Sequence, residues 1–153
     1  MENITYSVEQ VRDTIAQTFP DVVFDDAKME PRRLHMAADR SALFELCKLM
    51  KDGLGFDQCS LVSGVDYCTR FQAVYHITSY TSNITAEIAV DLPHDEPEVD
   101  SITPLWAGAN WHERETYDMY GIIFKGHPNL KRLLLPEDYQ FFPMRKDCPE
   151  GGR

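Results

Sequence analysis

The sequence contains no apolar run near the ~20 residues that a membrane-spanning helix requires. Its first ten residues, MENITYSVEQ, lack both the basic start and the apolar stretch of a signal peptide. Cysteine is sparse, and Cys47, Cys59, Cys68 and Cys148 include no Cys-x-x-Cys pair. We therefore expect a chain on the cytoplasmic side, without direct membrane insertion, whose reduced thiols hold no iron–sulfur cluster or zinc ion.

Basic residues are few: Lys and Arg number 15 against 25 Asp and Glu, and the net charge is −10. This balance argues against nucleic acid as a partner, because phosphate binding requires clustered cations. Residues 1–120 carry a charge of −12, whereas residues 121–153 carry +2. An acidic body with a slightly basic end suggests that the two parts face different surroundings.

The composition, 43% hydrophobic and 26% charged over 153 residues, is that of one globular domain. Ser7 is placed to cap a helix that ends before Pro20. Asp39 opens a second helical pattern, which ends near Gly55. Residues 22–24 and 32–37 are short candidate strands between these helices.

Three longer segments then alternate with a period of two, which is typical of half-buried strands. The residues that share a face are Leu61, Ser63, Val65 and Tyr67; Phe71, Ala73, Tyr75 and Ile77; and Ile84, Ala86, Ile88, Val90 and Leu92. Short connections favour antiparallel neighbours. We predict an α+β body over residues 1–92, a two-layer sandwich of a mainly antiparallel sheet with two helices.

The rest of the chain divides into an acidic linker, residues 93–105, and a segment of residues 106–153. Within that segment, residues 106–120 form a helical pattern that Gly121 is placed to end. Four of the nine prolines lie in residues 128–153, so no regular element is expected there. The tail is nevertheless too apolar to be disordered, and we expect it to lie on its own domain or on another chain.

The stretch HERETYDMYGIIFKGHP, residues 112–128, concentrates acids, an arginine and two histidines. A zinc-protease helix needs His-Glu-x-x-His, but Thr116 stands at the second histidine position. Glu113 and Glu115, two residues apart, point to different sides of a helix. A metal-dependent hydrolase centred on His112, Glu113 and Glu115 is therefore a remote alternative. A solvated helix face, with a weak ion pair between Arg114 and Asp118, fits the residues better.

A longer string, WHERETYDMYGIIFKGHPNLKRLLLPEDY followed by FPMRKDCP, resembles the signature of the 30 kDa subunit of respiratory complex I, found in NADH:quinone oxidoreductases and their relatives. The body matches that family only in layout. Tyr120, Asn129 and Cys148 depart from the residues common in the family, where phenylalanine, aspartate and an aromatic are usual.

The resemblance implies a non-catalytic assembly subunit in the peripheral arm of a proton-translocating complex, on the cytoplasmic side of an energy-conserving membrane. Its expected partners are the 49 kDa-like quinone-module subunit and the small iron–sulfur cluster subunit. Iron–sulfur clusters and quinone belong to those neighbours, and this chain is expected to hold no cofactor or metal. The donor stays open between NADH, a reduced deazaflavin and ferredoxin, with a membrane-bound hydrogenase as a further alternative.

The resemblance also implies a set of residues at the interface with these partners. They are Glu113, Arg114, Glu115, Asp118, His127, Pro128, Arg132, Leu135, Pro136, Glu137, Asp138, Arg145 and Lys146. Charged residues in this set would supply hydrogen bonds across the interface, and leucines would supply buried anchors.

Overall fold

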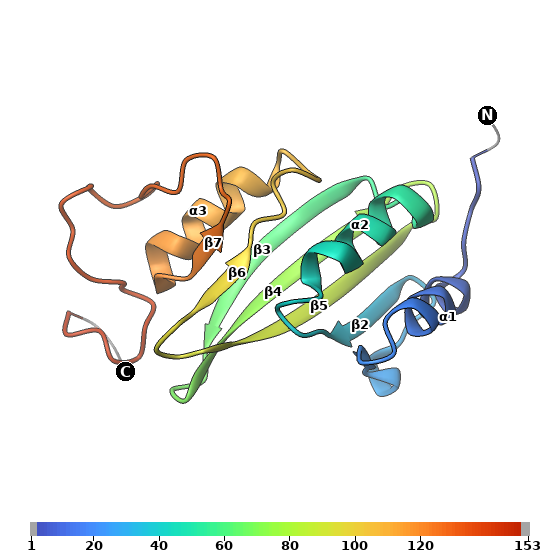
Figure 1. Ribbon diagram of the computed structural model, residues 1–153, viewed down its shortest axis with the longest axis horizontal. Helices are drawn as coiled ribbons and strands as arrows, with labels where there is room; N and C mark the ends of the chain where they lie inside the picture. The colour runs from blue at the N-terminus through green and yellow to red at the C-terminus, as the bar shows by residue number, and fades with distance from the viewer. Residues whose placement is uncertain (1–2, 151–153) are drawn as a thin grey trace.

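A computed structural model describes residues 3–150 of the chain as an α+β domain with an extended tail (Figure 1). The elements are α1 (Val8–Thr18), β1 (Val23–Phe24), the short 3-10 turn η1 (Asp26–Lys28), β2 (Arg33–Ala37), α2 (Leu43–Leu54), β3 (Gln58–Asp66), β4 (Arg70–Ser79), β5 (Ile84–Pro93), β6 (Glu98–Asp100), α3 (Ala109–Tyr120) and β7 (Ile123–Lys125). Five strands form one sheet in the order β1-β2-β5-β4-β3. Only β2 and β5 are parallel in this sheet, so the predicted α+β class is confirmed.

Local sequence explains how the first two helices begin and end. The Ser7 hydroxyl accepts a hydrogen bond from the Gln10 amide, and the Gln10 side chain accepts one from the Ser7 amide. This reciprocal capping box starts α1 where the sequence predicts it. The second helix differs: Asp39 accepts from the amide and hydroxyl of Ser41, and α2 begins only at Leu43. Gly55 ends α2 in the left-handed conformation, with φ of 70°.

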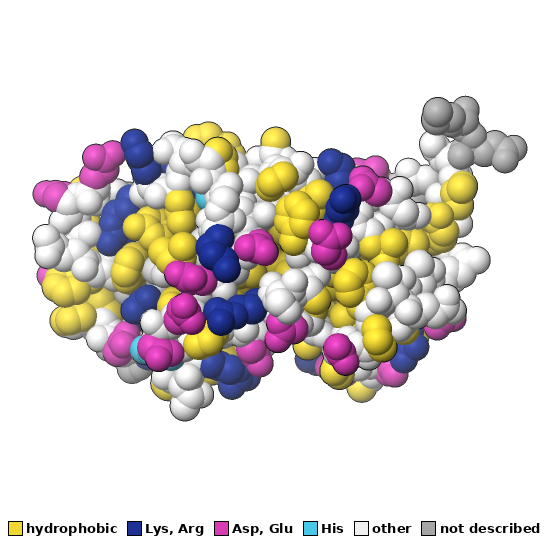
Figure 2. Space-filling model, viewed as in Figure 1, with side chains coloured by type: hydrophobic (Ala, Val, Ile, Leu, Met, Phe, Trp, Pro, Cys, Tyr) yellow, Lys and Arg dark blue, Asp and Glu magenta, His cyan; other side chains and the backbone are white. Residues whose placement is uncertain are grey.

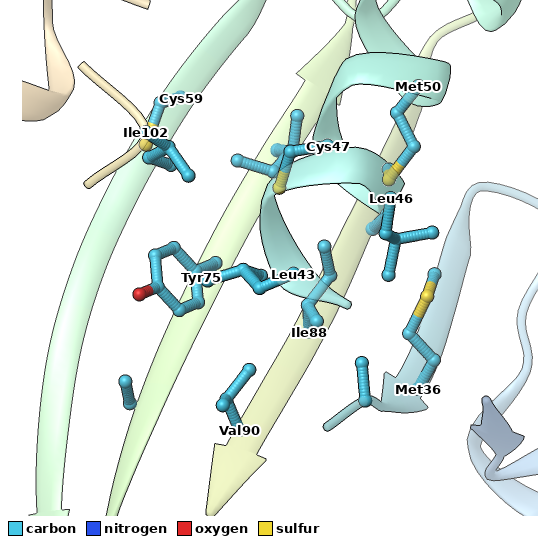
Figure 3. Packing of buried hydrophobic residues seen from close by; sticks show 14 of the residues in the cluster. Met36, Leu43, Leu46, Cys47, Met50, Cys59, Tyr75, Ile88, Val90 and Ile102 are labelled. Atoms are coloured by element: carbon cyan, nitrogen blue, oxygen red, sulfur yellow. The ribbon is translucent and has the colours of Figure 1, made fainter. Parts of the chain in front are cut away.

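The core lies between one face of the sheet and the helices. Strand register places Met36, Ile88, Tyr75 and Val62 in one row across β2, β5, β4 and β3. All four are buried, and in Figure 3 side chains of α2, among them Leu46 and Cys47, point toward this face of the sheet. The opposite face carries half-buried and exposed side chains, as expected for a sheet covered on one side.

The predicted core face of β3 is wrong. Leu61 and Tyr67 are 37% and 43% exposed, whereas Val62 and Gly64 are buried. The alternation exists, but the register shifts between Cys59 and Leu61, and the inward face contains residues that do not look apolar. Helix α3 packs closely on β3, and Gly64 leaves room for it. Because glycine is not an apolar side chain, the sequence pattern does not show that this side of β3 is the buried one.

The acidic linker predicted for residues 93–105 must also be revised. This interval contains β6, which pairs in parallel with β7, and Val99 and Ile102 are buried in the core. Strand β7 follows Gly121 and was not among the predicted elements. Each of these two strands has too few buried residues for a periodic pattern to be recognised. They also pair with each other across the intervening helix α3 in the sequence.

We predict that Gly64→Ala destabilises the protein. A Cβ atom at this position would lie 2.6 Å from the Tyr120 ring, so the packing of this side chain of α3 on β3 must change. Such overpacking typically costs about 1–3 kcal/mol, measurable by urea denaturation. Gly108→Ala is the matched control, because a Cβ there meets no atom within 4 Å. Equal stability of the two variants would contradict the close packing of α3 on β3.

Candidate functional site: a polar clamp between α3 and the tail

The carboxylate of Asp118, on α3, organises the first part of the tail. Its Oδ2 accepts hydrogen bonds from the amides of Leu133, Leu134 and Leu135 at 3.1, 2.7 and 3.0 Å. Its Oδ1 pairs with Arg132 at 2.8 Å, and the residue is fully buried. Burial alone would raise the pKa of Asp118, but the bonds from Arg132 and the three amides outweigh it and lower the pKa.

Arg132 connects α3 to the later part of the tail. One terminal nitrogen donates to the carboxylate and the carbonyl of Asp118, at 2.8 and 3.1 Å. The other donates to the carbonyls of Tyr139 and Phe141, at 2.7 and 2.8 Å. The guanidinium lies 5.4 Å from the Tyr139 ring centre and 5.0 Å from that of Phe142. A planar side chain with five donors suits this position, because lysine has neither the fork nor the flat faces.

A second arginine, on the helix itself, supports the same segment. Arg114 donates to the carbonyls of Lys131 and Arg132, at 3.2 and 3.0 Å, and lies over the Trp111 ring at 5.2 Å. Arg114 and Asp118 therefore do not form the ion pair with each other that the helical spacing suggested. Asp118 pairs with the tail, and Arg114 binds tail carbonyls.

The far end of the tail is attached at further points, among them a hydrogen bond from the Met144 amide to the Met119 carbonyl at 3.0 Å. Arg145 donates to the Tyr120 carbonyl at 2.6 Å and lies against the rings of Phe71 and Phe142. Close by, the amide of Lys146 donates to Asp66 at 2.8 Å, and Asp66 itself is buried at the end of β3. We call Asp66, Arg114, Asp118, Arg132 and Arg145 the tail clamp. It ties residues 131–146 to α3 and to the edge of the sheet.

Glu113 points the other way, into the domain. Its carboxylate accepts from the Ile102 amide at 2.8 Å and from the Ser101 hydroxyl at 2.7 Å, and the residue is fully buried. Burial raises the pKa of Glu113 to about 7 despite these two bonds. Through its bonds to Ser101 and Ile102, Glu113 holds the segment after β6 against α3.

His127 is a hydrogen-bonding turn residue, as its position before Pro128 suggests. Its Nδ1 accepts from the Asn129 amide at 2.9 Å, and Nε2 lies 3.2 Å from the Asn110 carbonyl. These contacts fit a neutral ring with the proton on Nε2. Burial lowers the pKa of His127, which agrees with a neutral state.

The structure divides the predicted interface residues into two groups. Glu113 and Asp118 are fully buried and hydrogen-bonded within the chain. The prediction that their side chains contact a partner directly must therefore be revised. Arg114, His127, Arg132, Leu135 and Arg145 are half-buried, while Glu115, Pro128, Pro136, Glu137, Asp138 and Lys146 are exposed. An interface role for these residues stays a prediction.

Sequence reasoning missed several residues of this region. Asp66 anchors the tail by accepting a hydrogen bond from the Lys146 amide. Its burial on the inner face of β3 would have marked it as a candidate, but the sequence does not show which face of β3 is buried. Trp111, Leu134 and Met144 are 59%, 63% and 53% exposed, which is unusual for large apolar side chains. They form the apolar part of the surface around the clamp.

The hydrolase alternative finds no support in the geometry. Glu113 faces Ser101 in the interior, whereas Glu115 is exposed, so the two carboxylates do not face a common substrate position. Within residues 3–150, no group of potential metal ligands includes His112, Glu113 or Glu115.

The fold and the clamp define a small α+β domain whose last helix holds an extended tail. The chain belongs to the family of the respiratory-chain NADH dehydrogenase 30 Kd subunit, whose model matches residues 36–153. The resemblance seen in the sequence is thus confirmed.

Individual relatives agree with this membership. The chain is 41% identical over 138 residues to the C subunit of the F(420)H(2) dehydrogenase of Methanosarcina mazei, covering 88% of this chain and 87% of that protein. It is 37% identical over 157 residues to the C subunit of the NADH-quinone oxidoreductase of Salinispora tropica, covering 99% of this chain but only 62% of that protein.

Solved structures share the fold. A trypsin-resistant fragment (1-134) of Nqo5 superposes with a TM-score of 0.71 at 28% identity, covering 80% of this chain and 98% of the fragment. A chain of the membrane-bound sulfane sulfur reductase, an archaeal respiratory membrane complex, gives a TM-score of 0.80 at 21% identity, covering 91% of this chain and 84% of that one. The second likeness speaks for the fold alone.

We predict that Asp118→Asn releases the tail. The asparagine side chain has nearly the same shape as aspartate, but it lacks the negative charge that pairs with Arg132 and accepts from three backbone amides. Breaking a buried ion pair costs about 3–5 kcal/mol. Trypsin should then cleave after Lys131 and Arg132 much faster than in the wild type. Asp138→Asn, at an exposed position, is the control. Unchanged cleavage in Asp118→Asn would show that the carboxylate does not hold the segment.

We also predict a pH dependence of stability that arises from Glu113. Its folded-state pKa of about 7 lies above the ordinary 4.5, so the folded state binds the proton more tightly. The free energy of unfolding should fall as the pH rises from about 4.5 to about 7, by roughly 3 kcal/mol from this group. Glu113→Gln should remove that fall, whereas Glu115→Gln should leave it. Denaturation at several pH values tests this, and an unaltered slope in Glu113→Gln would contradict it.

Proposed function

We propose that this protein is a non-catalytic assembly subunit in the peripheral arm of a complex I-type oxidoreductase, which passes electrons from NADH or another reduced donor to a quinone or quinone-like acceptor and translocates protons. The observation that carries the proposal is the tail clamp. Family-signature charges are turned inward to shape the tail, and large apolar side chains, Leu134 and Met144, stay exposed. A rigid surface with apolar anchors is suited to protein contact.

The surface itself fits that role. On the face drawn in Figure 2, hydrophobic side chains lie among charged ones over the tail end of the molecule. Interfaces between subunits commonly combine apolar centres with a polar rim. Exposed Lys131 and Glu137 can serve as such a rim beside Leu134.

The partners we propose are the 49 kDa-like quinone-module subunit and the small iron–sulfur cluster subunit of the same complex. Iron–sulfur clusters and quinone are proposed to reside on those neighbours, on the cytoplasmic side of the membrane. No helix in the described part of the chain is long and apolar enough to cross a membrane.

A second candidate concerns the electron donor. One relative, 41% identical and matched over most of both chains, belongs to an F(420)H(2) dehydrogenase. The same structural role in an F420H2-linked complex is therefore the alternative to an NADH-linked one. Identification of the subunits that co-purify from native membranes distinguishes them, since each donor requires a different input module.

We predict that Leu134→Asp lowers retention of this subunit in the detergent-purified complex without unfolding the chain. An anchor of this kind typically contributes about 1–2 kcal/mol or more, so occupancy should fall about tenfold. Ile4→Asp is the control, since Ile4 is exposed to a similar extent, 67% against 63%, and lies outside the tail. Turnover per assembled complex should be unchanged in both. Full retention with lost turnover would contradict the structural role.

A further inference from the structure

We propose that Asp66, His94 and Asp147 form a binding site for a divalent transition-metal ion, with zinc as the best-suited ion, that fastens the tail to the sheet. The three residues come from the end of β3, the segment after β5 and the tail. One potential ligand atom from each lies within 4.8 Å of the others. The proposal is independent of the function proposed above.

Two of the three ligands are already oriented. Asp66 is buried, and its oxygens are fixed by the amides of Cys68 and Lys146, at 2.7 and 2.8 Å. Each oxygen keeps a second lone pair for an ion. The ring of His94 stacks on Phe71 with centroids 4.8 Å apart and planes 13° from parallel. Such support holds ligands in place and lowers the cost of binding an ion.

The spacing fits an ion better than a hydrogen bond. Nε2 of His94 lies 3.8 Å from Oδ2 of Asp147, beyond hydrogen-bonding distance, and the ring makes no hydrogen bond to any described residue. Two tetrahedral zinc ligands at about 2.0–2.1 Å are about 3.4 Å apart, so the three ligand atoms, which lie within 4.8 Å of one another, must move somewhat closer together to bind the ion.

The chemistry of the donors favours zinc. Imidazole suits zinc and other transition metals more than calcium or magnesium, and two carboxylates balance a double positive charge. The neighbouring Arg145 guanidinium does not occupy the site, because it donates to the Tyr120 carbonyl. A fourth position is left for water or for a donor from another protein.

Bound zinc would join residue 147 of the tail to the sheet, on the far side of Arg145 from the Asp118 contacts. The ion would therefore add a further attachment at the end of the tail, beyond the contacts of Arg145 and the Lys146 amide. The expected sign is protection of the peptide bond after Lys146 from trypsin when zinc is present.

Titration calorimetry with zinc chloride on the purified chain tests the site. The wild type should bind one zinc ion, and Asp147→Asn and His94→Phe should each weaken binding by at least about tenfold. His94→Phe keeps a ring against Phe71, and Asp138→Asn is a matched carboxylate control that should bind like the wild type. Trypsin digestion with and without zinc provides the second measurement, in which zinc should protect the wild type but neither ligand variant.

Three outcomes would overturn the proposal. The wild type could bind no stoichiometric zinc, or the two ligand variants could bind it as tightly as the wild type. Alternatively, Cys68→Ser could abolish binding while His94→Phe retains it, which would assign the ion to the exposed thiol.

Discussion

The buried carboxylate of Asp118 receives three consecutive tail amides and an arginine, and the arrangement of the tail depends on this contact. Backbone amides that lack a strand or helix partner are costly to leave without an acceptor in a partly buried segment. Asp118 satisfies the amides of residues 133–135, and Arg132 satisfies carbonyls further on. A proline-rich tail can therefore hold one path against α3 without regular secondary structure.

This arrangement changes how the family signature should be understood. Charged residues in the signature of a subunit from a large complex suggest contacts between chains, yet Glu113 and Asp118 make their contacts within this one. Their role is to set the shape of the surface. The large apolar side chains that stay exposed around the clamp are Trp111, Leu134 and Met144.

Periodicity was enough to predict the body of the fold. The capping box at Ser7, the stripe of α2 and the alternation in β4 and β5 are local signals, and the elements they predict are present. The inward side of β3 could not be predicted, because Gly64 and Asp66 are buried only where α3 and the tail pack on them. Strands β6 and β7 could not be predicted for a similar reason, since each is three residues long and is stabilised by pairing with the other.

The sequence singled out residues of the clamp, as members of a predicted partner interface, but did not predict the contacts that they make within the chain. The resemblance pointed to Asp118, Arg132 and Arg145, whereas their partners lie 14 or more residues away along the chain or are backbone atoms, which no sequence motif displays. The central claim is that the tail is held within the chain, and amide hydrogen exchange on the isolated wild-type protein tests it most directly. The account predicts that the amides of residues 133–135 exchange far more slowly than that of exposed Asp138 in the same tail. Equally fast exchange at all of them would contradict it and would mean that the tail acquires its structure only on a partner.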